Sequence, residues 1–317
     1  MIGYIVHRLA QLLPVLLLAS LGIWAMIYAV PGGPVASMVG ENATPEQIQA
    51  TVERLGLDRP VLVQYWSWLT RAVQGDLGVS LQSRQPVLEL ILQRAPATVQ
   101  LGIAAIFIGL LIGIPVAVLS ALHPGSRLDR ALSGWSALAL GVPTFWLGIL
   151  LILLFAVELR WLPSASAYVS FWESPLEALR NLALPALTLG VYVSGIFARF
   201  LRASLLGELR ADYVRTARSK GLSERAVVIH HALRNAWLPV VTMIGLEFGF
   251  LLGGVVVIET VFSYPGIGRL VFNAINQRDI PVVQASVILL SGIFITLNLL
   301  VDLIYARLDP RVKLAGG

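Results

Sequence analysis

Long apolar segments without charged residues alternate with shorter polar segments along the chain. Six apolar segments reach about 20 residues, the length that an α-helix needs to cross the hydrocarbon core of a bilayer. They cover residues 9–30, 98–122, 131–157, 181–198, 235–258 and 280–301. This pattern predicts an all-α polytopic membrane protein with six transmembrane helices. Residues 1–30 hold the first of these helices, and residues 98–317 hold a core of the other five.

Residues 31–97 differ from the rest because they carry charges and turn signals. Residues 44–47 read Thr-Pro-Glu-Gln, a capping box with proline at the first helical position, and Gly56 can end that helix. Residues 60–74, which are rich in aromatic side chains, predict an amphipathic helix, and residues 86–93 predict a further short one. We expect residues 31–97 to form an extracytoplasmic helical lid inserted after the first transmembrane helix.

Residues 208–239 are the one long polar stretch between two apolar segments in the C-terminal half. The stretch carries six Arg or Lys residues and three Asp or Glu residues. Asp212 can cap a short helix, Gly221 can end it, and Ser223 can cap a second helix that runs toward Pro239. This helix–turn–helix pattern predicts a docking element for another protein. A solvated basic loop that only sets the membrane topology is the alternative.

The composition supports a membrane protein, because 57% of the residues are hydrophobic and only 13% are charged. A soluble domain carries about 25% charged residues. The net charge of +5 is better explained by basic cytoplasmic loops than by nucleic-acid binding. If both termini are cytoplasmic, 14 of the 23 Lys and Arg residues lie on the cytoplasmic side. The rule that cytoplasmic loops are basic therefore predicts this orientation, with residues 208–239 in the cytoplasm.

Glu247 is the single charged residue inside the predicted spans. A carboxylate at the centre of a bilayer is costly, so we expect it to face protein or water. It could contact a cationic or amine group of a substrate on a translocation path, relay a proton, or pack as a hydrogen-bonded side chain. The glycine stripes Gly109–Gly113 and Gly245–Gly249–Gly253 allow close helix contacts, within one subunit rather than between subunits.

Catalytic and cofactor-binding patterns are absent from the sequence. There is no cysteine and no glycine-rich phosphate-binding motif. His230 and His231 are adjacent, so on a helix they point in different directions and make a poor metal chelate. We therefore expect no catalytic, metal or cofactor site on this chain.

Residues 213–221 read Tyr-Val-Arg-Thr-Ala-Arg-Ser-Lys-Gly, and residues 231–239 read His-Ala-Leu-Arg-Asn-Ala-Trp-Leu-Pro. Together they resemble the EAA loop of bacterial ABC importer permeases. The resemblance is to the dipeptide, oligopeptide and nickel branch of the binding-protein-dependent transport inner-membrane component family. Ala217 and Gly221 match the motif, whereas Arg215 and Thr216 stand where its general form has Glu and Ala. Short motifs at residues 55–60, 75–78, 94–98 and 253–268 resemble motifs of the same branch in their order and spacing.

In that family, the loop forms the coupling helix that sits in a groove of the ATP-hydrolysing subunit. The resemblance therefore implies that residues 212–224 contact the ATPase and that residues 225–239 act as a lever to the fifth apolar segment. The expected coupling residues are Asp212, Tyr213, Arg215, Thr216, Ala217, Arg218, Ser219, Lys220, Gly221, Leu222, Ser223 and Glu224.

The resemblance also implies a type I ABC importer permease that carries short peptides across the inner membrane. Its partners would be a second homologous permease subunit, two ABC ATPase subunits that bind ATP and Mg, and an extracytoplasmic substrate-binding protein. The chain itself would be neither an enzyme nor a nucleic-acid-binding protein. Nickel chelates, glutathione and opines are alternative substrates in the same branch. A proton-coupled secondary transporter that uses Glu247, or a passive channel, is an alternative from another class.

Overall fold

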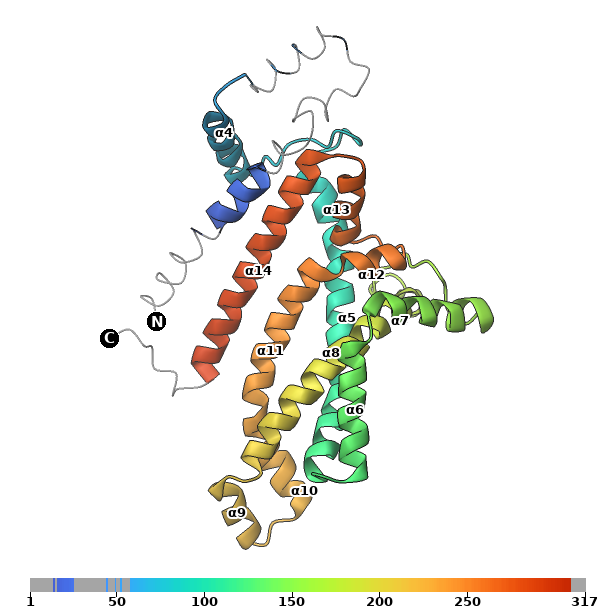
Figure 1. The fold of residues 1–317 in the computed structure, drawn as a ribbon, viewed down its shortest axis with the longest axis vertical. Helices are drawn as coiled ribbons and strands as arrows, with labels where there is room; N and C mark the ends of the chain where they lie inside the picture. The colour runs from blue at the N-terminus through green and yellow to red at the C-terminus, as the bar shows by residue number, and fades with distance from the viewer. Residues whose placement is uncertain are drawn as a thin grey trace, which may run out of the picture. The chain divides into compact units, whose positions relative to one another are not determined.

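The computed structural model describes residues 14, 16–25, 44, 49, 52 and 58–308 and is built from helices (Figure 1). The described β pairing is an isolated bridge between Val79 and Pro86. Two compact units group residues that are distant in the sequence. One unit is 1–96 with 266–295, and the other is 97–265 with 296–317. The predicted capping box at 44–47 and the stop at Gly56 lie outside the described residues, apart from Thr44.

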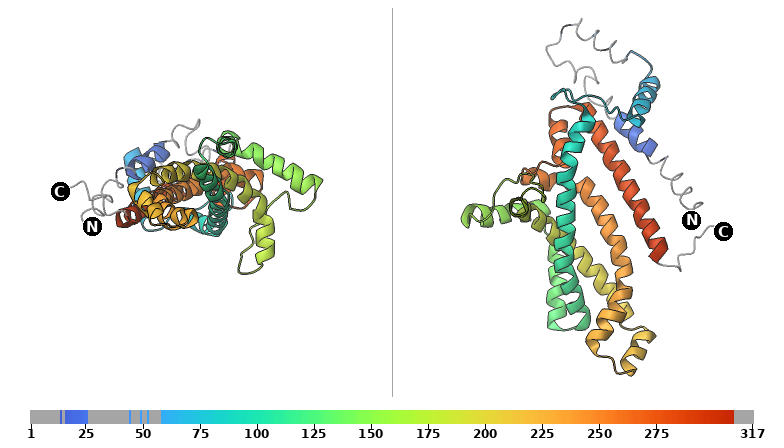
Figure 2. Two further views of the ribbon diagram at one scale, coloured as in Figure 1. Left: turned by 90° about the horizontal axis from the view of Figure 1, so that it is seen from below. Right: turned by 180° about the vertical axis from the view of Figure 1, so that it is seen from behind.

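The larger unit is organised around two long helices, α5 (Val87–Leu122), most of which lies in this unit, and α8 (Pro175–Glu208). Helix α8 packs against α6 (Arg127–Gly141) and α11 (Leu233–Gly254). Figure 2 shows these helices side by side from two further directions. Their apolar core includes Leu101, Val193 and Phe197.

Glycines set the spacing between α5 and α8. A Cβ atom on Gly109 would lie 2.5 Å from Cγ1 of Val193, and one on Gly113 would lie 3.0 Å from the carbonyl oxygen of Ser194. The predicted role of this stripe in packing within one subunit is confirmed. A Cβ atom on Gly245 of α11 would clash with Val301 of α14 (Ile280–Leu308), so the second stripe also begins with a contact inside the chain.

Three helices are long and apolar enough to cross a membrane among the described residues. They are Val87–Leu122, Pro175–Glu208 and Ile280–Val301, and the last has the bounds predicted for the sixth span. Two helix pairs reach that length and apolar character only when each pair is taken together, and each is bent at a break: Arg127–Gly141 with Thr144–Glu158, at 98°, and Glu224–Trp237 with Pro239–Leu252, at 49°. Of the first predicted span, the structure describes residue 14 and the helix Leu16–Ala25.

The prediction of one uninterrupted span over residues 131–157 is wrong. Helix α6 ends at Gly141, Val142 is extended, and α7 (Thr144–Leu151) with the π-helix η1 (Ile152–Glu158) starts in a new direction. Pro143 favours a break at this point. A residue before proline avoids the helical region, and proline has no N–H group with which to continue the hydrogen-bond ladder.

The smaller unit includes α4 (Val61–Val73), α13 (Ile267–Asn276) and the first part of α14. The predicted amphipathic helix over residues 60–74 is confirmed by α4. The prediction of a separate short helix at residues 86–93 is wrong, because these residues begin the continuous helix α5. Asp279 holds this unit's loops together by accepting hydrogen bonds from the Ser80 hydroxyl and the Leu81 amide.

Candidate coupling site

A short helix, α9 (Asp212–Ser219), connects α8 to the turn α10 (Glu224–Ala226). Gly221 follows α9 with a φ of +80°, a conformation that favours glycine, so its predicted role as a helix stop is confirmed. Ser223 caps α10 by accepting a hydrogen bond from the Ala226 amide, at 3.4 Å, also as predicted. The prediction that Asp212 is the cap of α9 is wrong. The extended residue before the helix is Ala211, and Asp212 is the first helical residue, where a carboxylate favours the helix dipole.

The inner face of α9 is buried in the larger unit. Val214 is fully buried and Ala217 is 6% exposed. Residues three apart share a helix face, so both side chains enter the same apolar cluster. The other buried members of the cluster are Ala117, Ala121, Leu201, Leu205, Val227, Ala232, Ala236 and Val240. The helices α5, α8 and α11 and the π-helix η2 (Val227–Ala232) supply these members, and η2 is the element against which α9 packs.

Polar contacts brace α9 at both ends. The Tyr213 hydroxyl donates to Oε2 of Glu208 on α8 and accepts from Nδ2 of Asn235 on α11, at 3.0 Å. Burial raises the pKa of the Tyr213 phenol, and the hydrogen bond to Glu208 acts in the same direction, so the hydroxyl stays protonated. At the other end, Arg218 donates to both carboxylate oxygens of Glu224, at 3.0 and 2.6 Å. This pair is exposed and contributes about 1 kcal/mol at most.

The outer face of α9 and the turn after it are exposed. The exposed residues of the predicted coupling set are Asp212, Tyr213, Arg215, Thr216, Arg218, Ser219, Lys220, Gly221, Leu222, Ser223 and Glu224. Leu222 adds an apolar side chain, 43% exposed, to this polar surface. Ala217 is the member of the set that lies on the inner face. A surface of this kind can bind another protein while the inner face stays packed.

Glu247 lies on α11, twelve residues after Asn235, which corresponds to about 18 Å along a helix. It is partly exposed, and its Oε2 atom is buried without a hydrogen-bond partner. The structure therefore does not bring Glu247 together with α9. Among the described residues, no group of three or more His, Asp or Glu side chains could hold a metal ion.

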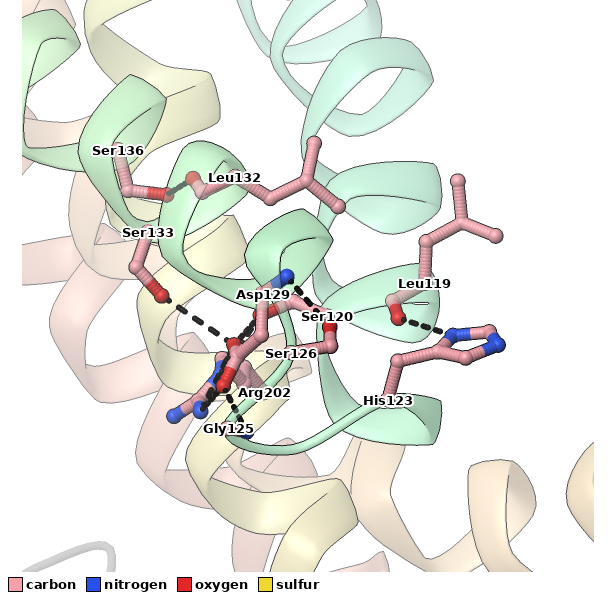
Figure 3. Close-up of polar contacts among 10 residues, drawn as sticks. All are labelled: Leu119, Ser120, His123, Gly125, Ser126, Asp129, Leu132, Ser133, Ser136 and Arg202. Atoms are coloured by element: carbon pink, nitrogen blue, oxygen red, sulfur yellow. Dashed lines mark hydrogen bonds and ion pairs between the residues drawn. The ribbon is translucent and has the colours of Figure 1, made fainter.

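A buried polar network was not predicted from the sequence (Figure 3). Asp129 of α6 accepts hydrogen bonds from Arg202 of α8, with Nε to Oδ1 at 3.0 Å and Nη2 to Oδ2 at 2.9 Å. Ser120 of α5 and the Gly125 amide also donate to Asp129. The pattern Ser126-x-x-Asp129 is an N-terminal helix signal, and Ser126 does cap α6. Nothing in the sequence could have identified Arg202 as the partner, because it lies 73 residues away.

Comparison with known proteins agrees with this architecture. The family described as binding-protein-dependent transport system inner membrane component matches residues 113–314. The N-terminal family of the same membrane components matches residues 1–102. The glutathione transport system permease protein GsiC of Escherichia coli strain K12 is 41% identical over 313 residues, which are 99% of each chain. The protein of the same name in Salmonella choleraesuis strain SC-B67 is also 41% identical, with the same coverage.

Solved structures show the same fold at low sequence identity. A methionine ABC transporter in an inward-facing conformation matches with a TM-score of 0.56 and 19% identity. The match covers 69% of this chain and 96% of that chain. A second crystal form of that transporter matches with a TM-score of 0.52, over 72% of this chain and 98% of that one.

The family match and the fold together define a permease subunit of an ABC importer, with the type I fold. It is a multi-pass inner membrane protein and a transport subunit rather than an enzyme. The chain belongs to the binding-protein-dependent transport system inner membrane component family. The expectation drawn from the loop motif is confirmed at this level, and the secondary-transporter and channel alternatives are excluded.

Proposed function

We propose that this permease carries short peptides into the cell, and that glutathione, itself a tripeptide, is among its substrates. The similarity to relatives named as glutathione permeases, over nearly the whole chain, supports this substrate class. Nickel chelates and opines are alternative cargoes. The complete importer would contain this chain, a second homologous permease, two ABC ATPases and an extracytoplasmic binding protein. Both chain termini would lie in the cytoplasm.

We propose further that α9 is the contact through which the ATPases drive transport. The observation that carries this proposal is that α9 has two different faces: its inner face is buried in an apolar cluster and its outer face is exposed. ATP and Mg would bind to the ATPases, and closure of the ATPases would push or pull α9. Because α9 packs against η2 and shares an apolar cluster with α5, α8 and α11, its displacement would move these helices and switch the side of the membrane to which the substrate path opens.

Within residues 208–239, residues 212–224 would touch the ATPase and residues 225–239 would transmit the displacement. This division is supported by burial. Val227, Val228, Ala232 and Ala236 are buried within the chain, whereas the outer face of α9 is exposed. A lever must be packed against the element that it moves, and a docking surface must be accessible.

Crosslinking tests the docking proposal. The chain has no cysteine, so a single introduced cysteine is its one thiol. In the assembled importer, we expect Ser219→Cys to crosslink to a cysteine introduced on the ATPase surface and the control Asn235→Cys to give no crosslink. Crosslinking from Asn235→Cys alone, or from neither position in an assembled complex, would reject the proposed contact.

Transport assays test the substrate class. The importer with its own binding protein is reconstituted in vesicles and supplied with glutathione, a dipeptide or a nickel chelate. We expect ATP-dependent uptake of glutathione or of the dipeptide and none of the chelate. Uptake of the chelate alone would place the chain in the metal-transporting part of the branch while leaving the role of α9 intact.

We propose Glu247 as a contact for the amino group of the passing peptide. The buried Oε2 atom without a partner supports this role, because an intramembrane carboxylate needs a donor or a cation. For Glu247→Gln, we expect weaker transport of peptides with a free amino group and unchanged transport of N-acetylated ones. Equal transport of both by the variant and the natural protein would instead indicate a packing role.

A further inference from the structure

The Asp129 network joins α5, α6 and α8 (Figure 3), at the end of the larger unit near which α9 lies (Figure 1). Asp129 lies near the start of α6 and is only 6% exposed. Arg202 of α8 approaches it with two nitrogen atoms, and the Ser120 hydroxyl of α5 donates to the same carboxylate. Arg202 also donates to the Ser120 hydroxyl, at 2.7 Å. The network therefore fixes the hairpin between α5 and α6 against α8.

This arrangement holds the helices in one register. An arginine can donate two parallel hydrogen bonds to a carboxylate only when the guanidinium and carboxylate planes are aligned. The contact therefore fixes the relative orientation of the two side chains as well as stabilising them. The Gly125 amide, at 2.9 Å, and the Ser133 hydroxyl, at 3.4 Å, also donate hydrogen bonds to the Asp129 carboxylate. Apolar contacts between helices can slide over short distances, whereas separation of Arg202 from Asp129 would leave the buried carboxylate without its cation. The network thus resists relative movement of α5, α6 and α8.

The network lies next to the packing of α9. Arg202 precedes the end of α8 at Glu208 by six residues, about 9 Å along a helix. Its neighbours Leu201 and Leu205 are fully buried in the cluster that receives Val214 of α9. On α5, Ala121 of the same cluster adjoins Ser120 of the network. A displacement of α9 therefore reaches α8 and α5 at the level where the network binds them together.

We infer that Asp129 and Arg202 are positioning residues that make α5, α6 and α8 move together when α9 is displaced. The inference rests on the proposed role of α9 as the ATPase contact. Without the network, α8 could tilt or rotate alone, and ATP hydrolysis would continue while less substrate crossed the membrane. The ion pair thus determines how much transport each ATP supports.

The test measures substrate transported per ATP hydrolysed by the complete importer in vesicles, with its binding protein. For Arg202→Gln and Asp129→Asn, we expect this ratio to fall about tenfold, within the range by which residues of a coupling network change coupling. ATP hydrolysis should persist, and the crosslink from Ser219→Cys to the ATPase should remain. The double variant should be no worse than either single variant, because both changes break one unit.

Matched variants separate positioning from general damage. Arg199→Gln removes an exposed arginine from the same helix, three residues earlier, and should leave the ratio unchanged. Arg202→Lys keeps the charge but loses the two parallel hydrogen bonds, so it should reduce the ratio less than Arg202→Gln. If the charge-removing variants do not assemble, Arg202→Lys and Ser120→Ala provide the same comparison.

An unchanged ratio in assembled Arg202→Gln and Asp129→Asn importers would overturn the inference. So would a fall of ATP hydrolysis and transport in equal proportion, because that result indicates fewer intact complexes. Absence of the Ser219→Cys crosslink in the otherwise natural protein would reject the proposed function of α9 instead. The two failures are therefore distinguishable.

Discussion

At the scale of single residues, glycine determines how closely the two longest helices pack. Gly190 of α8 faces Ile108 of α5, where a Cβ atom would lie 2.5 Å from Cγ2, and Gly109 makes the reciprocal contact with Val193. All four residues lie in or beside the same apolar core. The spacing of Gly109 and Gly113 predicted a packing stripe, but the sequence did not show that α8 is the partner. A glycine stripe marks a helix surface that another helix can approach closely, but only the fold determines which helix lies there.

Replacing Gly109 tests this packing. We expect Gly109→Ala to lower stability by about 1–3 kcal/mol, because Val193 is β-branched and cannot rotate away from the added methyl group. Thermal unfolding of the purified permease in detergent measures the effect. The control is Gly134→Ala on α6, where nothing lies within 4 Å of the added Cβ atom. Alanine favours a helix, so the control should be neutral or stabilising. Equal stability of the two variants would show that the helices are not in close contact here.

At the scale of elements, residues within α9 and just after it set the boundaries of this helix, whereas residues distant in the sequence contribute to its stability. Asp212, Gly221 and Ser223 mark the helix and the turn in the sequence, and the structure corrects only the capping role of Asp212. A helix of eight residues is too short to be stable alone in water. Burial of Val214 and Ala217 supplies the missing stability, and it comes from residues more than 80 positions away in α5 as well as from nearby ones.

Truncation of a buried side chain on the inner face of α9 should therefore weaken the packing of this helix. We expect Val214→Ala to destabilise the packing of α9 by about 2 kcal/mol, through lost apolar burial and a cavity. Hydrogen exchange of the α9 amides, measured by mass spectrometry, should become faster. Val257→Ala, at a site that is 49% exposed, is the control and should leave exchange in α9 unchanged. Unchanged exchange in the Val214 variant would mean that α9 is held mainly by its polar braces.

The break after α6 is a second feature of an element that hydropathy does not predict. Hydropathy alone predicts a single span over residues 131–157, since no charge interrupts it. Pro143 is visible in the sequence, yet Pro185 lies inside α8 without ending it, and Pro239 lies inside α11 where the chain bends by 49° and stays helical. Whether a proline ends a helix depends on what the chain packs against afterwards. Here Gly148 of α7 packs against Phe262 and Thr188, which favours the new direction.

At the scale of the whole molecule, charge distribution predicts how the chain is oriented in the membrane. Basic residues are concentrated in the segments assigned to the cytoplasm, including residues 208–239. The segment between η1 and α8 lies on the opposite side in this arrangement and is exposed at Ser164 and Trp172. The orientation determines which surface is available to the ATPases and which to a binding protein.

Cysteine labelling tests the orientation. In intact cells, a membrane-impermeant maleimide should label Ser164→Cys, and it should label Ser219→Cys only after the membrane is permeabilised. Both positions are exposed in the structure, so access depends on the side of the membrane rather than on burial. Labelling of Ser219→Cys in intact cells, with Ser164→Cys protected, would reverse the orientation and remove α9 from the cytoplasm.

The sequence by itself determined the class of protein and the place of α9. Spans are recognised from composition because a bilayer demands about 20 apolar residues in a row, and helix ends are recognised because glycine and serine act locally. Only the tertiary structure decided the bend at Pro143, the pairing of Gly109 with Val193, and the meeting of Asp129 with Arg202. These features depend on the rotation and register of helices, which side chains distant in the sequence settle by packing together.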